Sequence, residues 1–443
     1  MQKTSHPALI VIDRWLKYQC ANSELPGTQV SIRHRQNLIF SKAYGYADSV
    51  KKEVYTSKHV ARIASHSKLF TSALALLFQS QSRLRLSDLV VNYLPEFRQH
   101  RDPRFKKITL QDLLTNRSGL FRDGDDCDFW SLKSPFLSKS ELVKELLAAD
   151  LVYSPDRYTK YSNMGFSLMG LVLEKVGGEN YNTLVTQHII SRLGKTRLAP
   201  EYSDKFSWAM AKGHLRRRHY GQSFKTIDHS VTNALSAATG FCGNSESTTD
   251  FLQKLHQTNL ILPTNARAKL LKSKWPVKSI ATESYGLGTI FSKVNDSVYI
   301  GHSGGFPGFT SQTWSPQGSN YFFSFITNTN AVATFNAIRS MHEIIQKIET
   351  TFTRDELSSA IVSPPMADNF ISTIYVVSKR KALAFPLTGW LPTSDIMEFQ
   401  KHKDYFRSDN IRGYSSVGEP LRFYFKGKNI AAVKHGGFTS IAE

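Results

Sequence analysis

Helical periodicity dominates the first half of the chain. In residues 9–20, apolar side chains recur every three or four positions, which places them on one face of a helix. Residues 67–79 form a long run almost without charge, which is typical of a helix buried inside a large domain. Further helices are predicted over 110–114, 139–149 and 163–176, and Gly177-Gly178 ends the last of them.

Strand-like patterns lie on both sides of this helical region. A turn at Pro26-Gly27 precedes two short runs, 29–32 and 38–43, that predict antiparallel strands. From about residue 284 the pattern returns to strands and then to one amphipathic helix. The strands are predicted over 286–291, 298–301, 310–314 and 321–327, and the helix over 333–350. This order predicts an α+β domain whose first and last segments share one sheet.

The pattern changes again after about residue 355. The stretch around Ser363-Pro364-Pro365 is typical of a linker, and short strand-like runs separated by Gly and Asn turns follow it. We therefore predict two domains, a large one over residues 1–355 and a small C-terminal β-rich one over 356–443. The second shows no pattern of catalytic residues.

Charge raises the possibility of a nucleic-acid partner. The chain has 56 Lys and Arg against 36 Asp and Glu, a formal net charge of +20. The basic clusters are short (104–107, 216–218 and 379–381), and no nucleic-acid-binding motif accompanies them. We predict no nucleic-acid partner, and the basic surface could still attract anionic substrates or membrane surfaces. The oligomeric state is left open.

Cysteine use and hydropathy indicate the compartment. Three widely spaced cysteines give neither a disulfide framework nor a C-x-x-C metal site, and we predict no metal and no cofactor. The apolar run at residues 8–12 is too short for a signal peptide, and no stretch approaches the ~20 residues of a membrane span. The prediction is a cytoplasmic protein without a transmembrane segment, or a periplasmic one if a signal has been removed.

Ser65 and Lys68 are the first candidates for catalysis. Three residues are about one helical turn, so their side chains are expected on the same face. Burial lowers the pKa of a lysine, and a neutral amine can take the proton of a serine nucleophile. The same S-x-x-K spacing occurs at Ser49 and Ser378, but only Ser65 precedes a helix that is expected to be buried. On its own, Ser65 is more typical of a helix cap.

A second candidate segment is Tyr161-Ser162-Asn163, at the start of a predicted helix. The Tyr161 phenol could share proton transfer with Lys68, and the Asn163 amide could hold a substrate carbonyl. The alternative for Tyr161 is an aromatic residue packed in the core with its hydroxyl hydrogen-bonded.

The third candidate segment is the run from Gly301 through His302 to Gly304 and Gly305, after a predicted strand. Glycine lets the backbone approach a ligand, and the Gly305 N–H could form an oxyanion hole with that of Ser65. His302 could orient substrate or adjust the Lys68–Tyr161 pair. The segment also fits G-x-S-x-G, with Ser303 as nucleophile, but that motif needs a helix directly after it, and the glycines and Pro307 disfavour one.

The order S-x-x-K, Y-x-N and H-x-G resembles the class C β-lactamase-like serine hydrolases. That family includes β-lactamases, D,D-carboxypeptidases, D-aminopeptidases and related carboxylesterases. The likeness extends over about residues 9–350 and includes flanking segments 86–97, 108–120 and 285–288. It implies a fold like that of β-lactamases and penicillin-binding proteins, an antiparallel sheet with a helical region, followed here by a small C-terminal β-domain.

The resemblance also implies roles and exceptions. Ser65, Lys68, Tyr161 and His302 are the expected catalytic residues, and Asn163, Gly304 and Gly305 the expected substrate-binding ones. Asn116 stands where the family usually has histidine, and Arg192 where proline is common. His302 stands where β-lactamases usually carry lysine, and a mostly neutral histidine attracts a β-lactam carboxylate less.

These observations predict an acyl-enzyme hydrolase of a small-molecule or peptide substrate, with an ester, amide or peptide bond cleaved. An esterase or a D-amino-acid-type peptidase is the first interpretation. A β-lactamase or D,D-carboxypeptidase is the alternative, and a non-catalytic binding protein on the same fold is the second.

Overall fold

The computed structural model divides the chain into two compact units. One is Leu25–Thr334, and the other consists of Met1–Glu24 and Phe335–Glu443. The structure describes residues 6–22, 25–124, 127–202, 204–215, 223–330, 334–367, 372–390, 396–408, 419–435 and 438–442. The basic run at 216–218 lies outside these residues.

The unit Leu25–Thr334 is built on a nine-stranded antiparallel sheet of order β3-β2-β1-β13-β12-β11-β10-β9-β8. Its strands are β1 (Gly27–His34), β2 (Asn37–Asp48), β3 (Glu53–Val54), β8 (Lys274–Pro276), β9 (Glu283–Gly286), β10 (Ile290–Val294), β11 (Ser297–Phe306), β12 (Phe309–Pro316) and β13 (Tyr321–Thr327). The first strand pairs with the last, Thr28 opposite Thr327 and His34 opposite Tyr321. The predicted sharing of one sheet by the two ends of the domain is therefore confirmed.

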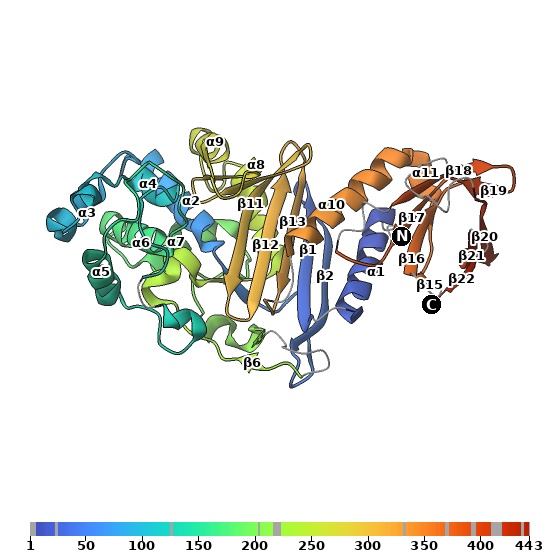
Figure 1. Cartoon of the computed structure of the whole chain (residues 1–443), viewed down its shortest axis with the longest axis horizontal. Helices are drawn as coiled ribbons and strands as arrows, with labels where there is room; N and C mark the ends of the chain where they lie inside the picture. Colours follow the sequence, from blue (N-terminus) through green and yellow to red (C-terminus); the bar gives the residue numbers. More distant parts are fainter. Residues whose placement is uncertain are drawn as a thin grey trace. The chain divides into compact units, whose positions relative to one another are not determined.

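A helical region lies on the side of the sheet where β11 runs (Figure 1). Its helices are α3 (Val90–Tyr93), α4 (Leu110–Leu114), α5 (Lys139–Ala148), α6 (Asn163–Gly177) and α7 (Tyr181–His188). Helix α2 (Ser67–Ser80) is buried from Ser67 to Phe78 and packs against α6 and α7. The prediction from its nearly uncharged sequence is confirmed: a helix without a polar face lies in the core.

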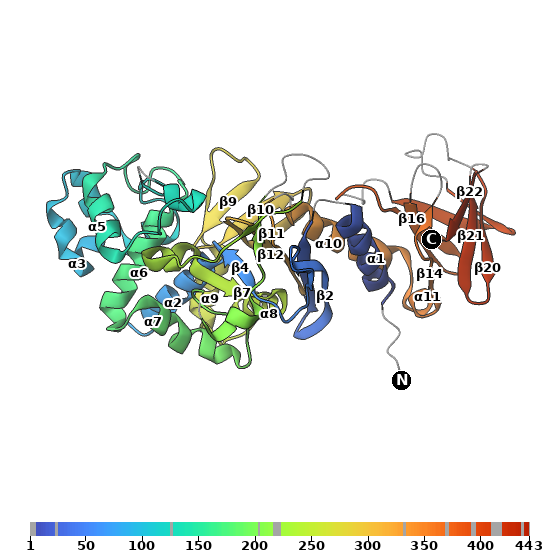
Figure 2. The ribbon, with the colours of Figure 1, turned by 90° about the horizontal axis from the view of Figure 1, so that it is seen from below.

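Helices α8 (Ser245–Gln257) and α9 (Thr264–Lys272) complete this unit, and both are seen from below in Figure 2. Helix α8 packs across β1, β12 and β13, with Phe251 and Leu252 buried. A small two-stranded sheet pairs β4 (Ala61–Ala64) with β7 (Phe241–Gly243). β4 leads directly to Ser65 and α2, so this short sheet fixes where the candidate nucleophile stands.

One predicted strand was wrong. The run 286–291 is not continuous, because β9 ends at Gly286 and β10 begins at Ile290. Between them Gly288 has φ +65°, a conformation that strands do not use. A Cβ at Gly288 would lie 2.5 Å from the Lys68 carbonyl oxygen, so the turn also packs closely on α2.

The second unit contains α1 (Pro7–Asn22), α10 (Thr334–Thr351), α11 (Arg354–Ser359) and the C-terminal strands. The strands are β14 (Ile361–Val362), β15 (Met366–Ala367), β16 (Ser372–Val377), β17 (Lys381–Pro386), β18 (Met397–His402), β19 (Tyr405–Arg407), β20 (Leu421–Lys426), β21 (Asn429–His435) and β22 (Phe438–Ala442). β15 pairs with β22, and β16 pairs with both β15 and β17. The ladder from β15 through β22 and back to β17 therefore closes on itself as a barrel.

Helix α1 is tied to this second unit through side chains far apart in sequence. The Trp15 and Trp390 rings meet edge to face with centroids 5.7 Å apart, and Arg14 Nη1 donates to the Val362 carbonyl at 3.0 Å. The sequence predicted two domains that follow one another along the chain, 1–355 and 356–443. The two units described above are instead defined by which residues contact one another. The predicted boundary therefore stays a prediction.

Candidate active site

Ser65 lies at the junction of β4 and α2. The backbone turns sharply there, because Ala64 has φ +50°, a left-handed conformation that non-glycine residues seldom adopt. Such strain is held in place by surrounding structure and is frequent at functional sites. From Ala61 to Phe70 only Ser65 keeps appreciable exposure, so the hydroxyl is accessible while its support is buried.

Lys68 is fully buried one turn after Ser65. Its Nζ donates to Asn163 Oδ1 at 2.7 Å and to the Ala238 carbonyl at 2.8 Å, and it lies 3.3 Å from Ser65 Oγ. Burial lowers the pKa of Lys68 well below its usual value; Asp123 opposes this shift and Arg122 adds to it. The amine is thus favoured in its neutral form by its surroundings.

The Tyr161 phenol donates to Ser65 Oγ at 2.7 Å. The Lys68 amine also lies 4.6 Å from the centre of the Tyr161 ring. Burial raises the pKa of the phenol above its usual value, so Tyr161 keeps its proton at neutral pH. The structure therefore brings Ser65, Lys68 and Tyr161 into mutual contact, as their positions in the sequence predicted.

Asn163 is the first residue of α6 and is almost fully buried. Its Oδ1 accepts from Lys68, and its Nδ2 donates to Asp123 Oδ1 at 2.6 Å. Arg122 Nε donates to the other Asp123 oxygen at 2.9 Å. Asp123 thus fixes which end of the amide faces Lys68. The predicted hydrogen bond from Asn163 to a substrate carbonyl stays a prediction.

His302 lies on β11 beside the Tyr161 ring, with ring centres 6.5 Å apart. Its Nδ1 is 2.6 Å from the Ser303 carbonyl, and its Nε2 is 3.1 Å from the Tyr285 hydroxyl. A carbonyl only accepts, so Nδ1 carries the proton and Nε2 accepts from Tyr285. Burial, with Lys68 and His66 nearby, lowers the pKa of His302 well below 6.5, so the ring is neutral.

Gly304 and Gly305 follow on the same strand. A Cβ at Gly304 would lie 2.1 Å from the Ile63 carbonyl oxygen, whereas a Cβ at Gly305 would meet nothing within 4 Å. Gly304 therefore lets β11 approach β4, and Gly305 is open on the exposed side. β11 continues to Phe306 and turns into β12, with no helix after Ser303. The alternative that places the nucleophile at Ser303 is thus contradicted.

Sequence reasoning missed three contributors to the site. Three groups contact the predicted residues: Asp123, the Ala238 carbonyl and the Tyr285 hydroxyl. None of them belongs to the same short sequence motif as the residue that it contacts. Asp123 comes shortly after the 108–120 segment that resembles the family, and this position was the usable signal. A backbone carbonyl gives no signal in the sequence at all.

Asn116, one of the departures from the family pattern, braces the Tyr161 segment. Its Oδ1 accepts from the Ser162 N–H at 3.0 Å, and its own carbonyl accepts from the Lys160 N–H at 2.7 Å. The amide therefore contributes to holding the residues on both sides of Tyr161 in place.

Across the described ranges, no group of three or more His, Cys, Asp or Glu residues is arranged to hold a metal ion. Within the same part of the chain, none of the helices combines the length and apolar character needed to cross a bilayer.

Curated relatives match part of the chain. Protein flp of Staphylococcus aureus (strain MW2) is 28% identical over 182 residues, 41% of this chain and 36% of that protein. Beta-lactamase-like protein 2 of Dictyostelium discoideum is 28% identical over 198 residues, 44% of this chain and 36% of its own length. The matched part is thus about a third of each of these relatives.

Solved structures with this fold cover more of the chain. D-amino acid amidase from Ochrobactrum anthropi SV3 aligns with a TM-score of 0.65 and 19% identity, over 77% of this chain and 99% of that one. The octameric penicillin-binding protein homologue from Pyrococcus abyssi aligns with a TM-score of 0.65 and 16% identity, over 97% and 99%. A class C beta lactamase from Rhodobacter sphaeroides aligns with a TM-score of 0.62 and 16% identity, over 76% of this chain and 99% of that one.

These likenesses show a β-lactamase and penicillin-binding-protein type of fold with a C-terminal β-barrel. The model of the Beta-lactamase family matches residues 12–344, which include every candidate residue named above. The expected resemblance is confirmed. This chain belongs to the Beta-lactamase family, whose fold is shared by D-amino acid amidases and β-lactamases.

Proposed function

We propose that the chain is a serine hydrolase that cleaves an ester, amide or peptide bond through an acyl-enzyme on Ser65. One observation carries this proposal: the Ser65 hydroxyl lies 3.3 Å from the Lys68 amine and 2.7 Å from the Tyr161 phenol. A serine needs such a partner, because its hydroxyl is a weak nucleophile until its proton is removed.

The hydrogen bonds support Lys68 as the base. A neutral amine has two N–H groups and one lone pair, and the oxygens of Asn163 and Ala238 can only accept. With both N–H groups engaged there, the lone pair faces Ser65. Because Tyr161 donates to Ser65 Oγ, the serine hydrogen is free to point at Lys68.

The reaction then proceeds in two halves. Ser65 Oγ bonds to the substrate carbonyl carbon while its proton passes to Lys68, and the N–H groups of Ser65 and Gly305 are the proposed donors to the oxyanion. Tyr161 protonates the leaving group and recovers a proton from Lys68, which leaves the acyl ester. A water molecule then attacks that ester, its proton passes to the same pair, and the acid product departs with Ser65 restored.

The proposed substrate is an ester, or an amide or peptide of a D-amino acid. The neutral ring of His302 supports this choice, because it lacks the charge that would attract a β-lactam carboxylate. The D-amino acid amidase from Ochrobactrum anthropi SV3, a neighbour of the same fold, was solved with D-phenylalanine. Hydrolysis of a β-lactam or of a D,D-peptide is the second candidate, supported by the class C beta lactamase neighbour.

Labelling with a fluorophosphonate tests the proposal. Wild type is expected to take up one equivalent on Ser65 and to hydrolyse p-nitrophenyl esters, whereas Ser65→Ala is expected to lose both. Ser49→Ala is the matched control, because Ser49 also stands three residues before a lysine, and it should retain both. An unlabelled wild-type protein would favour the non-catalytic binding protein instead.

Relative turnover ranks the substrate classes. We expect p-nitrophenyl esters or D-amino-acid amides to be hydrolysed faster than nitrocefin under the same conditions. Dominant hydrolysis of nitrocefin would contradict the inference from His302 and leave the role of Ser65 intact.

A further inference from the structure

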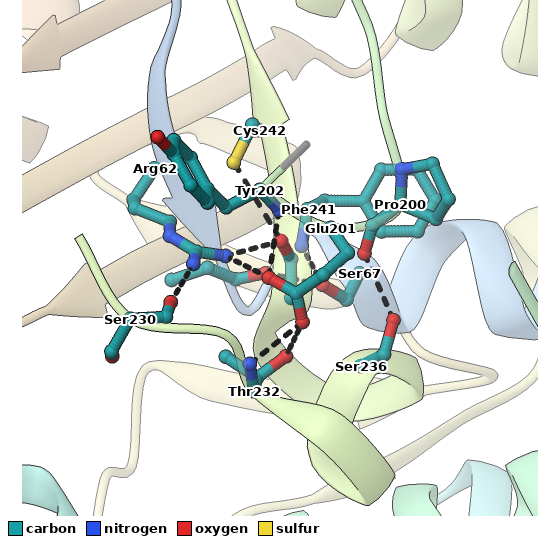
Figure 3. A network of polar contacts seen from close by, with 12 residues as sticks. Arg62, Ser67, Pro200, Glu201, Tyr202, Ser230, Thr232, Ser236, Phe241 and Cys242 are labelled. Carbon is teal, nitrogen blue, oxygen red and sulfur yellow. Dashed lines mark hydrogen bonds and ion pairs between the residues drawn. The ribbon is translucent and has the colours of Figure 1, made fainter. Parts of the chain in front are cut away.

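A largely buried ion pair involves the strand that leads to the candidate nucleophile. Arg62 stands on β4 three residues before Ser65 and is 1% exposed. Its Nη1 donates to Glu201 Oε1 at 2.6 Å and to the Gly240 carbonyl at 2.7 Å, and its Nη2 donates to the Ser230 carbonyl (Figure 3). One guanidinium thus joins β4 to three other points of the chain.

The Glu201 carboxylate extends this network to further segments. Its Oε2 accepts from both the backbone N–H and the hydroxyl of Thr232, the former at 2.7 Å, and its Oε1 accepts from the Tyr202 N–H at 2.7 Å. Figure 3 labels Glu201, Tyr202, Ser230 and Thr232 around the Arg62 side chain. The pair therefore anchors both ends of the segment 230–240.

That segment carries the carbonyl that binds Lys68. The π-helical turn Ser236–Gly240 packs against α2. There the Ala237 carbonyl accepts from Thr71 Oγ1 at 2.6 Å and the Ala238 carbonyl accepts from Lys68 Nζ at 2.8 Å. Gly240, bound by Arg62, is two residues further on. Its neighbour Phe241 donates its N–H to Ser67 Oγ at 3.0 Å.

We infer that Arg62 and Glu201 are positioning residues, which hold the Ala238 carbonyl against the Lys68 amine and so direct that amine at Ser65. This inference rests on the proposed role of Lys68. Arginine suits the task, because its planar fork bonds a carboxylate and two carbonyls at once, which an ammonium on a flexible stem does not reproduce. Glu201 neutralises the buried charge that this arrangement requires.

A loosened turn would change two properties of Lys68. Its ammonium would lose an acceptor, which disfavours the charged form and lowers the pKa further. Its lone pair would also lose its fixed direction. The other titratable groups facing the amine are Tyr161, Asp123, Arg122 and His302, and all of them stay unchanged in the test.

The test measures the acylation rate of full-length Glu201→Gln and Arg62→Lys with a p-nitrophenyl ester across pH. We expect a loss of about tenfold to a hundredfold in kcat, with little change in KM, and an acid limb moved to lower pH. Thr232→Val, which removes only the hydroxyl contact with Glu201, is a milder variant that should shift both properties in the same direction. It keeps the test decisive if the other variants fail to fold.

Asp250→Asn is the matched control, since Asp250 forms a largely buried pair with Arg33 at 3.1 Å elsewhere in the unit. It should leave the pH profile in place. The inference is overturned if Glu201→Gln or Thr232→Val lowers only the melting temperature, or changes the profile no more than the control does. A wild-type protein that fluorophosphonate does not label would instead refute the proposed function.

Discussion

At the scale of single residues, the site separates two proton-carrying groups by their surroundings. Burial lowers the pKa of the Lys68 amine and raises that of the Tyr161 phenol, so both groups are driven to their uncharged forms. An uncharged lysine is a base, and an uncharged tyrosine is an acid. The same physical cause thus assigns opposite roles to the two neighbours of Ser65.

The pH dependence of hydrolysis should report Lys68. Only the neutral amine accepts a proton, so kcat/KM is expected to rise with pH through the pKa of Lys68, below the usual 10.5. Asp123 favours the ammonium, so Asp123→Asn should move this rise to lower pH while its amide oxygen still accepts from Asn163. Rates of ester hydrolysis across pH provide the measurement.

Asp150→Asn serves as the control for that shift, because Asp150 is an exposed partner of Arg101. A rise that stays in place in Asp123→Asn, or moves to higher pH, would contradict this account of Lys68.

At the scale of elements, the site depends on how closely β11 approaches β4. Gly304 faces the Ile63 carbonyl at a distance that leaves no room for a side chain, while Gly305 beside it faces open space. Close packing therefore requires glycine at position 304 but not at position 305.

Alanine substitutions at these two positions test this difference in packing. We expect Gly304→Ala to lower the free energy of unfolding by about 1–3 kcal/mol, because the strands must move apart. Gly305→Ala should leave it nearly unchanged. Denaturant titration of both variants measures the free energy of unfolding. Equal decreases would show that the close approach of β11 to β4 does not set the stability lost at Gly304.

Much of the element pattern was predictable, and the reasons for the failures are physical. The run 67–79 predicted α2 because a helix almost without charge is expected to be buried, and the strand-like runs 29–32, 310–314 and 321–327 predicted β1, β12 and β13. The single π-helical turn Ser236–Gly240 gave no such signal, since five residues are too few to show a repeating pattern. The contact of Ser65, Lys68 and Tyr161 was predicted, whereas the Ala238 carbonyl was not, because any residue supplies a carbonyl.

At the scale of the whole molecule, each unit contains a histidine that is buried and held neutral. Burial lowers the pKa of His66, in Leu25–Thr334, and of His342, in the other unit, to about 4. The unfolded chain binds these protons near pH 6.5, and the folded one only near pH 4. Stability contributed by the neutral rings is therefore full above pH 6.5 and lost as the pH falls towards 4.

Acid should thus destabilise both units. The shift from 6.5 to about 4 corresponds to roughly 3 kcal/mol for each histidine at its limit. Urea titrations at pH 7 and pH 4.5 measure this loss, and His342→Gln should reduce it for the second unit alone. A loss as large in His342→Gln as in wild type would assign acid sensitivity to other groups.

The closed ladder of the C-terminal strands has a consequence for how this protein meets other chains. Strands at the margin of an open sheet expose unpaired peptide groups that can recruit a foreign strand and begin a fibril. From β15 through β22 and back to β17, each strand has neighbours on both sides, so the cylinder offers no such margin among the described residues. In the other unit the outermost strands are two and three residues long, and one of them ends in Pro276. Self-association through added strands is thereby discouraged in the C-terminal ladder. In the other unit β3 pairs with β2 only at Tyr46 and Asp48, so no described strand covers that side of residues 37–42.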